Sequence, residues 1–214
     1  MTTAIIGSNI RVEVQQTLGS AKTITVLTRA NPGVVTSAAH GFDNGDVVVF
    51  TMTEGMVELD GQAGRVANKT TDTFEIEGLD TTNYSAFTAG TCKEVTAFQT
   101  MSAAQNVSMP NPAPAKIETT TLIDKTKQYQ YGLPEAPDGT INGLFNPAGT
   151  AEALIKAATK ANTPLVFRLT YSDSRKSLFN ANVSGGTGFD LQPNAAATAT
   201  VSFTPVKDVM HFAT

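Results

Sequence analysis

The feature that most constrains the fold is a run of short apolar segments separated by turn-forming residues between positions 31 and 91. Four apolar residues at 47–50 follow the sequence Asp-Asn-Gly-Asp, and the segment at 73–76 is followed by Glu-Gly. Glycine adopts the positive φ angles that tight turns need, and Asn and Asp tolerate them. Turns at this density predict a small, self-contained β module.

The segments on either side of this run predict a second β unit. Residues 10–14 alternate apolar and charged side chains, as a half-buried strand does. Further strands are expected at 116–122, 140–146, 165–171, 177–183 and 198–204, with another at 206–212. The expected strands of the interrupting module lie at 23–27, 33–37, 47–52, 64–68, 73–77 and 91–95.

One helix is expected over residues 151–161. Thr150 is the expected N-cap, Glu152 lies in the first turn, where its charge suits the helix dipole, and Asn-Thr-Pro at 162–164 ends the helix. The expected apolar stripe consists of Ala153, Leu154, Ala157, Ala158 and Ala161. The fold class is therefore predicted as mainly β. Residues 1–21 and 98–214 form a β-sandwich or barrel with one packed helix, and residues 22–97 form an inserted small β-barrel.

The segment 100–115 carries three prolines, at 110, 112 and 114. Proline donates no ladder hydrogen bond and keeps the chain extended. Two interpretations stay open: a linker from the insert back to the sandwich, or a long loop that docks on a neighbouring subunit.

Charge is sparse and unevenly distributed. Charged residues make up 16% of the chain, against about 25% in typical soluble domains, and the net charge is −4. Residues 22–97 hold 10 acidic and 5 basic side chains, whereas the remainder holds 9 acidic and 10 basic. A dedicated nucleic-acid binder needs clustered Lys and Arg, so this class is disfavoured. The acidic insert is expected on a solvated outer surface.

The residue types that carry catalysis or bind metals are few. Cys92 is the single cysteine, which excludes an intramolecular disulfide, and it is expected in the core or at a strand edge rather than as a nucleophile. His40 is expected to bond the backbone in a turn, with a ligand or pH-switch role as the alternative. His211 is expected to be structural or interfacial.

Two loops also carry polar groups in suggestive patterns. The acidic residues of the insert lack the spacing of a calcium loop, so solvated turns are expected and weak calcium binding is the alternative. The Ser-Gly-Gly-Thr-Gly sequence at 184–188 precedes no helix with a following Lys-Ser or Lys-Thr, so a loop is expected rather than a phosphate site. We expect no enzyme activity, no cofactor and no metal.

Two parts of the chain resemble known families. His40-Gly41-Phe42, Gly45-Asp46, Met-Val-Glu-Leu-Asp-Gly at 56–61 and Thr-Phe-Glu-Ile at 73–76 resemble a small β-barrel insert of phage tail proteins, which is also likened to a half-domain of ubiquitin-activating enzymes. That second likeness concerns shape and implies no adenylation or thioester chemistry. Leu-Phe-Asn at 144–146, the helix and the segments 164–169, 177–183 and 198–203 resemble the major tail tube protein of long-tailed, non-contractile phages, the siphophages.

The resemblance implies a structural protein of the virion tail, made and assembled in the host cytoplasm. Six copies would form a ring by pairing sheet edges, and rings would stack into the tube that conducts DNA into the host. Its implied partners are other copies of itself, the tape measure protein, tail terminator and tail-tip proteins, and genomic DNA that passes without sequence-specific binding. No membrane partner is implied, and no apolar run approaches the ~20 residues of a membrane-spanning helix.

Contacts between copies are expected at two kinds of site. The loop candidates are Met109, Pro110, Asn111 and Pro112. The strand candidates are Arg11, Glu13, Thr198, Thr200 and Ser202, on faces opposite to the expected core residues. The strands 10–16 and 198–204 are accordingly the candidates for the inner sheet.

A binding module is the alternative function: a virion adhesin or baseplate component that recognises a host receptor or glycan. The insert itself has two possible roles, surface decoration with weak glycan affinity or a brace between subunits. From the sequence, deletion of residues 22–97 is expected to leave tube assembly intact.

Overall fold

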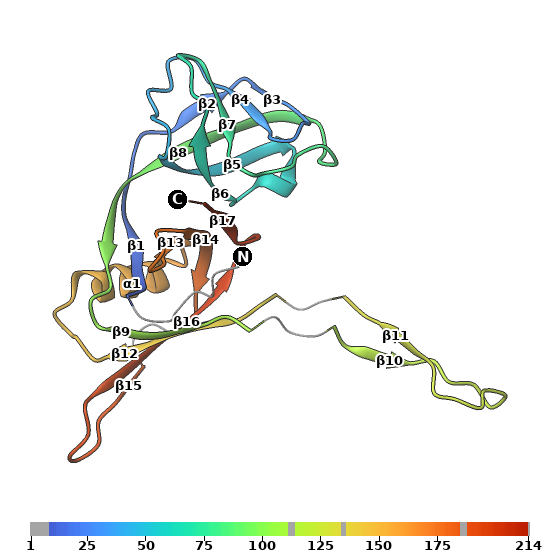
Figure 1. Ribbon diagram of the computed structural model, residues 1–214, viewed down its shortest axis with the longest axis vertical. Coiled ribbons are helices and arrows are strands. Elements are labelled where there is room, and N and C mark those ends of the chain that lie inside the picture. Colours follow the sequence, from blue (N-terminus) through green and yellow to red (C-terminus); the bar gives the residue numbers. More distant parts are fainter. Residues whose placement is uncertain (1–8, 111–113, 134–135, 185–187, 214) are drawn as a thin grey trace.

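The computed structural model describes residues 9–110, 114–133, 136–184 and 188–213 (Figure 1). These residues are mainly β, with large antiparallel sheets and one α-helix, as predicted. The main path of hydrogen-bonded strands runs β3-β4-β7-β6-β5-β8-β1-β13-β14-β16-β12-β9. We call residues 22–97 the insert and the remaining residues, apart from the arm defined below, the main lobe.

The insert is a small β unit around its own apolar residues, among which Phe50, Phe74 and Ile76 are fully buried. Gly45 has a φ of 96° in the turn before β5, as the turn-rich sequence predicted. The predicted strand 23–27 is divided, because β2 pairs with β8 whereas β3 pairs with β4. The elements are β2 (Lys22–Ile24), β3 (Val26–Leu27), β4 (Val34–Thr36), β5 (Val47–Gly55), a 3-10 turn (Val57–Leu59), β6 (Ala63–Ala67), β7 (Thr73–Ile76) and β8 (Phe87–Thr100).

The main lobe curls its strands around a second core. Phe167, Phe179 and Phe203 form its centre, with ring centroids 5.2–5.6 Å apart. The alternation predicted for residues 198–203 is confirmed, since Val201 and Phe203 are buried while Thr198 and Thr200 are exposed. Its strands are β1 (Arg11–Leu18), β9 (Ala104–Ser108), β12 (Gly139–Leu144), β13 (Leu165–Thr170), β14 (Lys176–Val183), β15 (Gly188–Asp190), β16 (Thr198–Pro205) and β17 (Met210–Phe212).

Helix α1 (Thr150–Ala161) covers the core of the main lobe and differs from its prediction in two respects. Gly149 occupies the N-cap position with no side-chain hydrogen bond, so Thr150 is the first helical residue and not the cap. The buried stripe is Ala151, Ile155 and Ala158, spaced as i, i+4 and i+7. The predicted alanines at 153, 157 and 161 are exposed, because the helix turns the face that carries Ile155 towards the core.

Between β9 and β12 the chain forms a projecting hairpin, residues 114–133, which we call the arm. Its strands β10 (Lys116–Glu118) and β11 (Tyr129–Tyr131) make a separate two-stranded sheet (Figure 1, right). For residues 100–115, the sequence predicted either a linker or a docking loop. Instead, residues 104–108 form β9, which pairs with β12, and the projecting segment begins later in the chain.

The insert and the main lobe are joined by more than the chain connections. Strand β8 runs from the insert into the main lobe, where it pairs with β1. The apolar cluster of the insert includes Val166, Leu178, Met210 and Phe212 from the main lobe. Because this single cluster contains residues of both parts, the insert packs against the surface formed by β13, β14 and β17. The division of the chain into domains at residues 22 and 97 stays a prediction.

Polar contacts secure the same junction. The Asn180 side-chain amide donates to the Gly61 carbonyl at 2.9 Å, and the Gln62 amide donates to the Asp208 carbonyl at 3.2 Å. The Arg65 guanidinium pairs with Glu77 and lies over the Phe212 ring, 4.7 Å from its centroid. The C-terminal segment therefore holds the insert from the side of the main lobe.

Gly139→Ala is expected to destabilise the main lobe by about 1–3 kcal/mol or more, the usual cost of overpacking a core. A Cβ at Gly139 would lie 2.2 Å from Cζ of the buried Phe203 ring. The control is Gly188→Ala, since no atom lies within 4 Å of a Cβ there. Urea unfolding monitored by circular dichroism measures both variants, and equal midpoints for the two would contradict the packing described.

Candidate assembly surfaces

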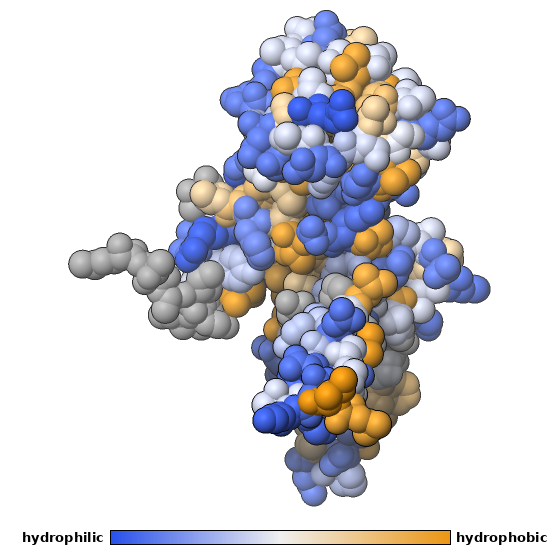
Figure 2. All heavy atoms as spheres, turned by 90° about the vertical axis from the view of Figure 1, so that its right-hand side faces the viewer, coloured by the Kyte–Doolittle hydropathy of each residue, from blue (hydrophilic) through white to orange (hydrophobic). Residues whose placement is uncertain are grey.

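The largest set of exposed apolar side chains lies on the arm. Over the described residues, six of the twelve large exposed hydrophobic side chains belong to it: Ile117, Leu122, Ile123, Tyr129, Tyr131 and Leu133. In Figure 2 the arm points towards the viewer, and apolar side chains gather at its end. Exposure of this much apolar surface to water is unfavourable. An apolar projection of this kind therefore indicates an interaction site.

The arm has little support from the rest of the chain. Every residue from 115 to 131 is exposed, and the turn at its end is held locally, with the Thr121 N–H donating to the Asp124 carboxylate at 2.8 Å. This bond and that from the Thr121 hydroxyl lower the pKa of Asp124. Isolated two-stranded hairpins are marginally stable in water. The arm therefore gains stability from any surface that covers it.

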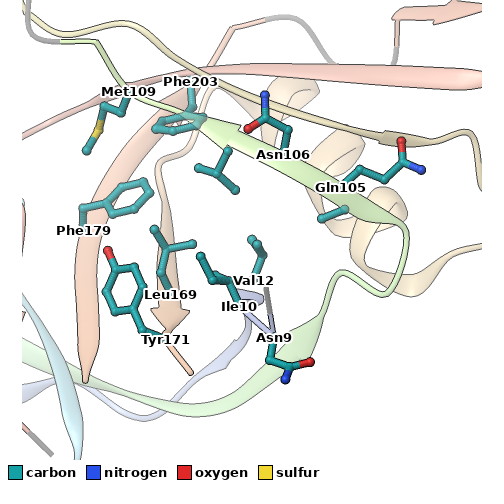
Figure 3. Close-up of a pocket in the computed structure, with 12 residues that line it drawn as sticks. Asn9, Ile10, Val12, Gln105, Asn106, Met109, Leu169, Tyr171, Phe179 and Phe203 are labelled. Carbon is teal, nitrogen blue, oxygen red and sulfur yellow. The ribbon is translucent and has the colours of Figure 1, made fainter. Parts of the chain in front are cut away.

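A second feature is an apolar cleft between the start of β1 and strand β9 (Figure 3). Its volume is about 490 Å³, and none of the residues that line it is charged. The buried side chains of Leu169, Phe179 and Phe203 line its inner part, and its polar groups are side-chain amides, such as that of Asn106, and the Tyr171 hydroxyl. Volumes of 300–1,000 Å³ are usual for binding pockets.

The third feature is the polar face of β16, β12 and β9. Registers place Thr200 beside Asn142 and Asn142 beside Asn106, and the Thr200 hydroxyl donates to the Asn142 carbonyl oxygen at 2.8 Å. These three strands contain no charged residue. In Figure 1 they lie on the far side of the main core from the insert.

The structure places the predicted contact residues on three different surfaces. Met109 lines the cleft and Pro110 is exposed beside it, while residues 111 and 112 lie outside the described part of the chain. Thr198, Thr200 and Ser202 lie on the polar face of β16. Arg11 and Glu13 belong to the face of β1 that continues into Arg168 and Leu178, on the side of the insert.

The carboxylate of Glu13 forms an ion pair within its own chain. Glu13 is 6% exposed, its carboxylate accepts a bond from Arg168 Nε at 2.7 Å, and the Arg168 guanidinium lies 4.0 Å from the centroid of the Phe98 ring. The two predicted inner strands thus turn their polar faces in different directions. The contact role of Glu13 stays a prediction, although its carboxylate already has an internal partner.

Sequence reasoning missed Leu122 and Ile123 as surface residues. Their signal was present, because Leu-Ile follows three threonines and directly precedes the turn at Asp124. An apolar pair at a turn without a neighbouring apolar segment is a candidate for contact with another molecule. The sequence predicted a strand at 116–122, whereas the strand β10 covers only Lys116–Glu118 and leaves Leu122 beyond its end.

The candidate reactive groups occupy structural positions. Cys92 is buried in β8, and burial raises the pKa of its thiol to about 12, so thiolate is scarce at neutral pH. His40 is buried, and its Nδ1 accepts a bond from the Phe42 N–H at 3.0 Å, which confirms its predicted backbone contact. His211 Nδ1 lies 2.7 Å from the buried Ser177 hydroxyl.

The acidic residues of the insert bind their own turns. An Asp46 carboxylate oxygen accepts from the Asp43 N–H at 2.7 Å, and Asp60 accepts from the Met52 N–H at 2.9 Å. A hydrogen bond from Lys69 and its charge lower the pKa of Asp43. Across the described ranges, no three His, Cys, Asp or Glu side chains are grouped to hold a metal ion. The same ranges contain no helix long and apolar enough to span a membrane.

Comparison with known proteins finds a family match for the insert. The model of the ubiquitin-activating enzyme E1 FCCH domain matches residues 30–96. Ubiquitin-like modifier-activating enzyme 1 is 42% identical over 71 residues in Homo sapiens and 37% identical over 70 residues in Oryctolagus cuniculus. Each match spans 31% of this chain and 6% of the enzyme.

Two solved structures are similar to part of this chain. One is from the virion of a native gene transfer agent particle, with 11% identity and a TM-score of 0.42, covering 54% of this chain and 89% of the other. The second is from the tail of an empty gene transfer agent particle with C6 symmetry, with 12% identity and a TM-score of 0.42, covering 54% and 87%. The family match therefore concerns one module, and the main lobe and the arm lie outside it.

Proposed function

We propose that this chain is a structural subunit of a virion tail, and specifically the tail tube protein of a siphophage or related prophage. In this role copies join into hexameric rings, and rings stack into a tube that conducts DNA into the host. The observation that carries the proposal is the arm, whose apolar side chains are exposed in the single chain and become buried when copies associate. The resemblance of the main-lobe segments to tail tube proteins supplies the kind of assembly.

Two further features support a tube. Strand β9 ends the described strand path, and an edge strand offers backbone groups to which a neighbouring copy can pair. The charge-free polar face of β16, β12 and β9 suits the inner wall of a tube that passes a polyanion, because it has no Lys or Arg that would retain phosphate groups. The insert lies across the main core from this face. In the proposed tube it would therefore project from the exterior.

The partners follow from this role. Tape measure, tail terminator and tail-tip proteins would contact the tube, and genomic DNA would pass through without sequence-specific recognition. Assembly would take place in the host cytoplasm. Catalysis has no part in the proposal, because self-association alone performs the function.

Negative-stain microscopy of the purified full chain tests the proposal across a concentration series. Tubes of uniform diameter or stacked rings are the expected result, and analytical ultracentrifugation should show the same concentration-dependent growth. Discrete monomers or trimers at high concentration, also in the presence of tail-tip complexes, would contradict it. That outcome would favour the adhesin or baseplate role, which needs no polymer.

A further inference from the structure

The chain carries an apolar projection and an apolar cleft at separate places. At the end of the arm, Leu122 and Ile123 are 109% and 91% exposed, so neither packs on its own chain. The cleft between β1 and β9 is lined by uncharged residues, among them Val107, Met109 and Tyr171 (Figure 3). Leu122 and Ile123 are fully exposed, and among the described residues of the cleft Ile10, Val107, Met109 and Tyr171 are partly exposed.

We propose that the Leu122–Ile123 tip of one copy seats in the β1–β9 cleft of a second copy. The inference rests on the proposed function and names the receiving surface of the arm. A projection that fits a cleft elsewhere on an identical molecule makes a heterologous contact, which repeats from copy to copy. Such a contact builds a closed ring or an open polymer, depending on the rotation between copies. The pairing needs no other protein, because every copy supplies both halves.

The chemistry of the two surfaces agrees. The tip presents two aliphatic side chains, and the cleft offers aliphatic and aromatic side chains with neutral amides such as Gln105 and Asn106 at its edge. The side chains of Leu122 and Ile123 and the residues that line the cleft are uncharged, so their contact buries no ion when the neighbouring Asp124 and Lys125 stay outside the cleft. A charged segment would have to lose its hydration to enter the same cleft and would bind it less favourably.

Other apolar segments compete less well for the cleft. Phe189, on β15, already lies against Phe145 with ring centroids 4.9 Å apart. The first eight residues of the chain directly precede Asn9, which lines the cleft, and include Ala-Ile-Ile at 4–6. They are therefore the alternative occupant, which an experiment must distinguish from the tip of the arm. The tip is favoured because it is fully exposed and belongs to a hairpin that lacks other support.

Thiol cross-linking between two variants tests the contact. One full-length chain carries Ile123→Cys and the other Gln105→Cys, and the two are assembled together and treated with a short bis-maleimide. Cys92 is buried and its thiol has a raised pKa, so the native thiol is not expected to react with the maleimide. A heterodimer band is expected at least about tenfold stronger than for Ile123→Cys with Glu54→Cys, an exposed control position on the insert, because contact raises the local thiol concentration.

The outcomes separate this inference from the proposed function. Tubes that form normally but give no Ile123→Cys to Gln105→Cys product would overturn the docking site and leave the tube role standing. A single chain carrying Ile6→Cys and Gln105→Cys that cross-links internally at high dilution would also overturn it, because the cleft would then be filled by its own chain. A wild-type chain that never polymerises would instead refute the tube role itself.

Discussion

Removal of residues 22–97, with a short flexible linker in their place, is expected to leave a main lobe that does not fold cooperatively. The sequence suggested the opposite, since the insert looked separable. In the structure, however, deletion uncovers Val166, Leu178, Met210 and Phe212, which belong to the apolar cluster of the insert. At about 1.5–3 kcal/mol for each buried side chain, the loss is roughly 6–12 kcal/mol, comparable with the whole stability of a typical domain.

The deletion also shortens a strand that both parts share. Strand β8 would lose Val95 and Ala97, which pair with Leu18 and Thr17 of β1. Circular dichroism and urea unfolding measure the result, and the expected trace lacks a cooperative transition. The matched control is the same deletion with Leu178→Thr, Met210→Thr and Phe212→Thr, which makes the uncovered surface polar and should recover part of the folding.

A deletion protein that unfolds cooperatively near the wild-type midpoint would contradict this account of the junction. If it also formed tubes, the insert would be a detachable decoration, as the sequence first suggested. If it folded but formed no tubes, the insert would be a brace between copies. The experiment therefore also decides between the two roles proposed for this module.

The double substitution Leu122→Asp and Ile123→Asp is expected to suppress polymerisation by raising its critical concentration, while leaving the stability of the single chain unchanged. Both side chains are exposed in the chain, so their replacement removes no internal contact. In a polymer, each would be buried against a neighbour and an aspartate there would be desolvated without a partner. Loss of two buried aliphatic side chains, at about 1.5–3 kcal/mol each, raises the critical concentration at least about 100-fold.

Sedimentation across a concentration series, with microscopy of the pellet, measures this effect. The matched control is Val57→Asp, which places the same charge at an exposed apolar position on the insert and should assemble as wild type. Urea unfolding of all variants checks that folding is preserved. Polymers of normal length from the double variant at the wild-type critical concentration would show that the tip has no part in assembly.

Local patterns in the sequence were sufficient for the fold class and for most strands. The alternation of Thr198, Ala199, Thr200, Val201 and Ser202 fixes which face is buried, because a strand places successive side chains on opposite sides. Asn162 ends the helix with a φ of 50°, as its place in Asn-Thr-Pro predicted. Strand β9 escaped detection, since Ala-Gln-Asn-Val-Ser contains little of the apolar pattern of a strand.

The sequence by itself determined that this chain is a mainly β protein with one helix, a turn-rich module and a cysteine that is not a nucleophile. Only the tertiary structure decided which surfaces are free. Glu13 lies next to two valines in a strand and is buried because Arg168, 155 residues away in the chain, covers it. Leu122 belongs to the same apolar class as the core residues and is exposed because no described segment of the chain packs onto the end of the arm. Burial depends on contacts between distant segments, and local periodicity carries no record of them.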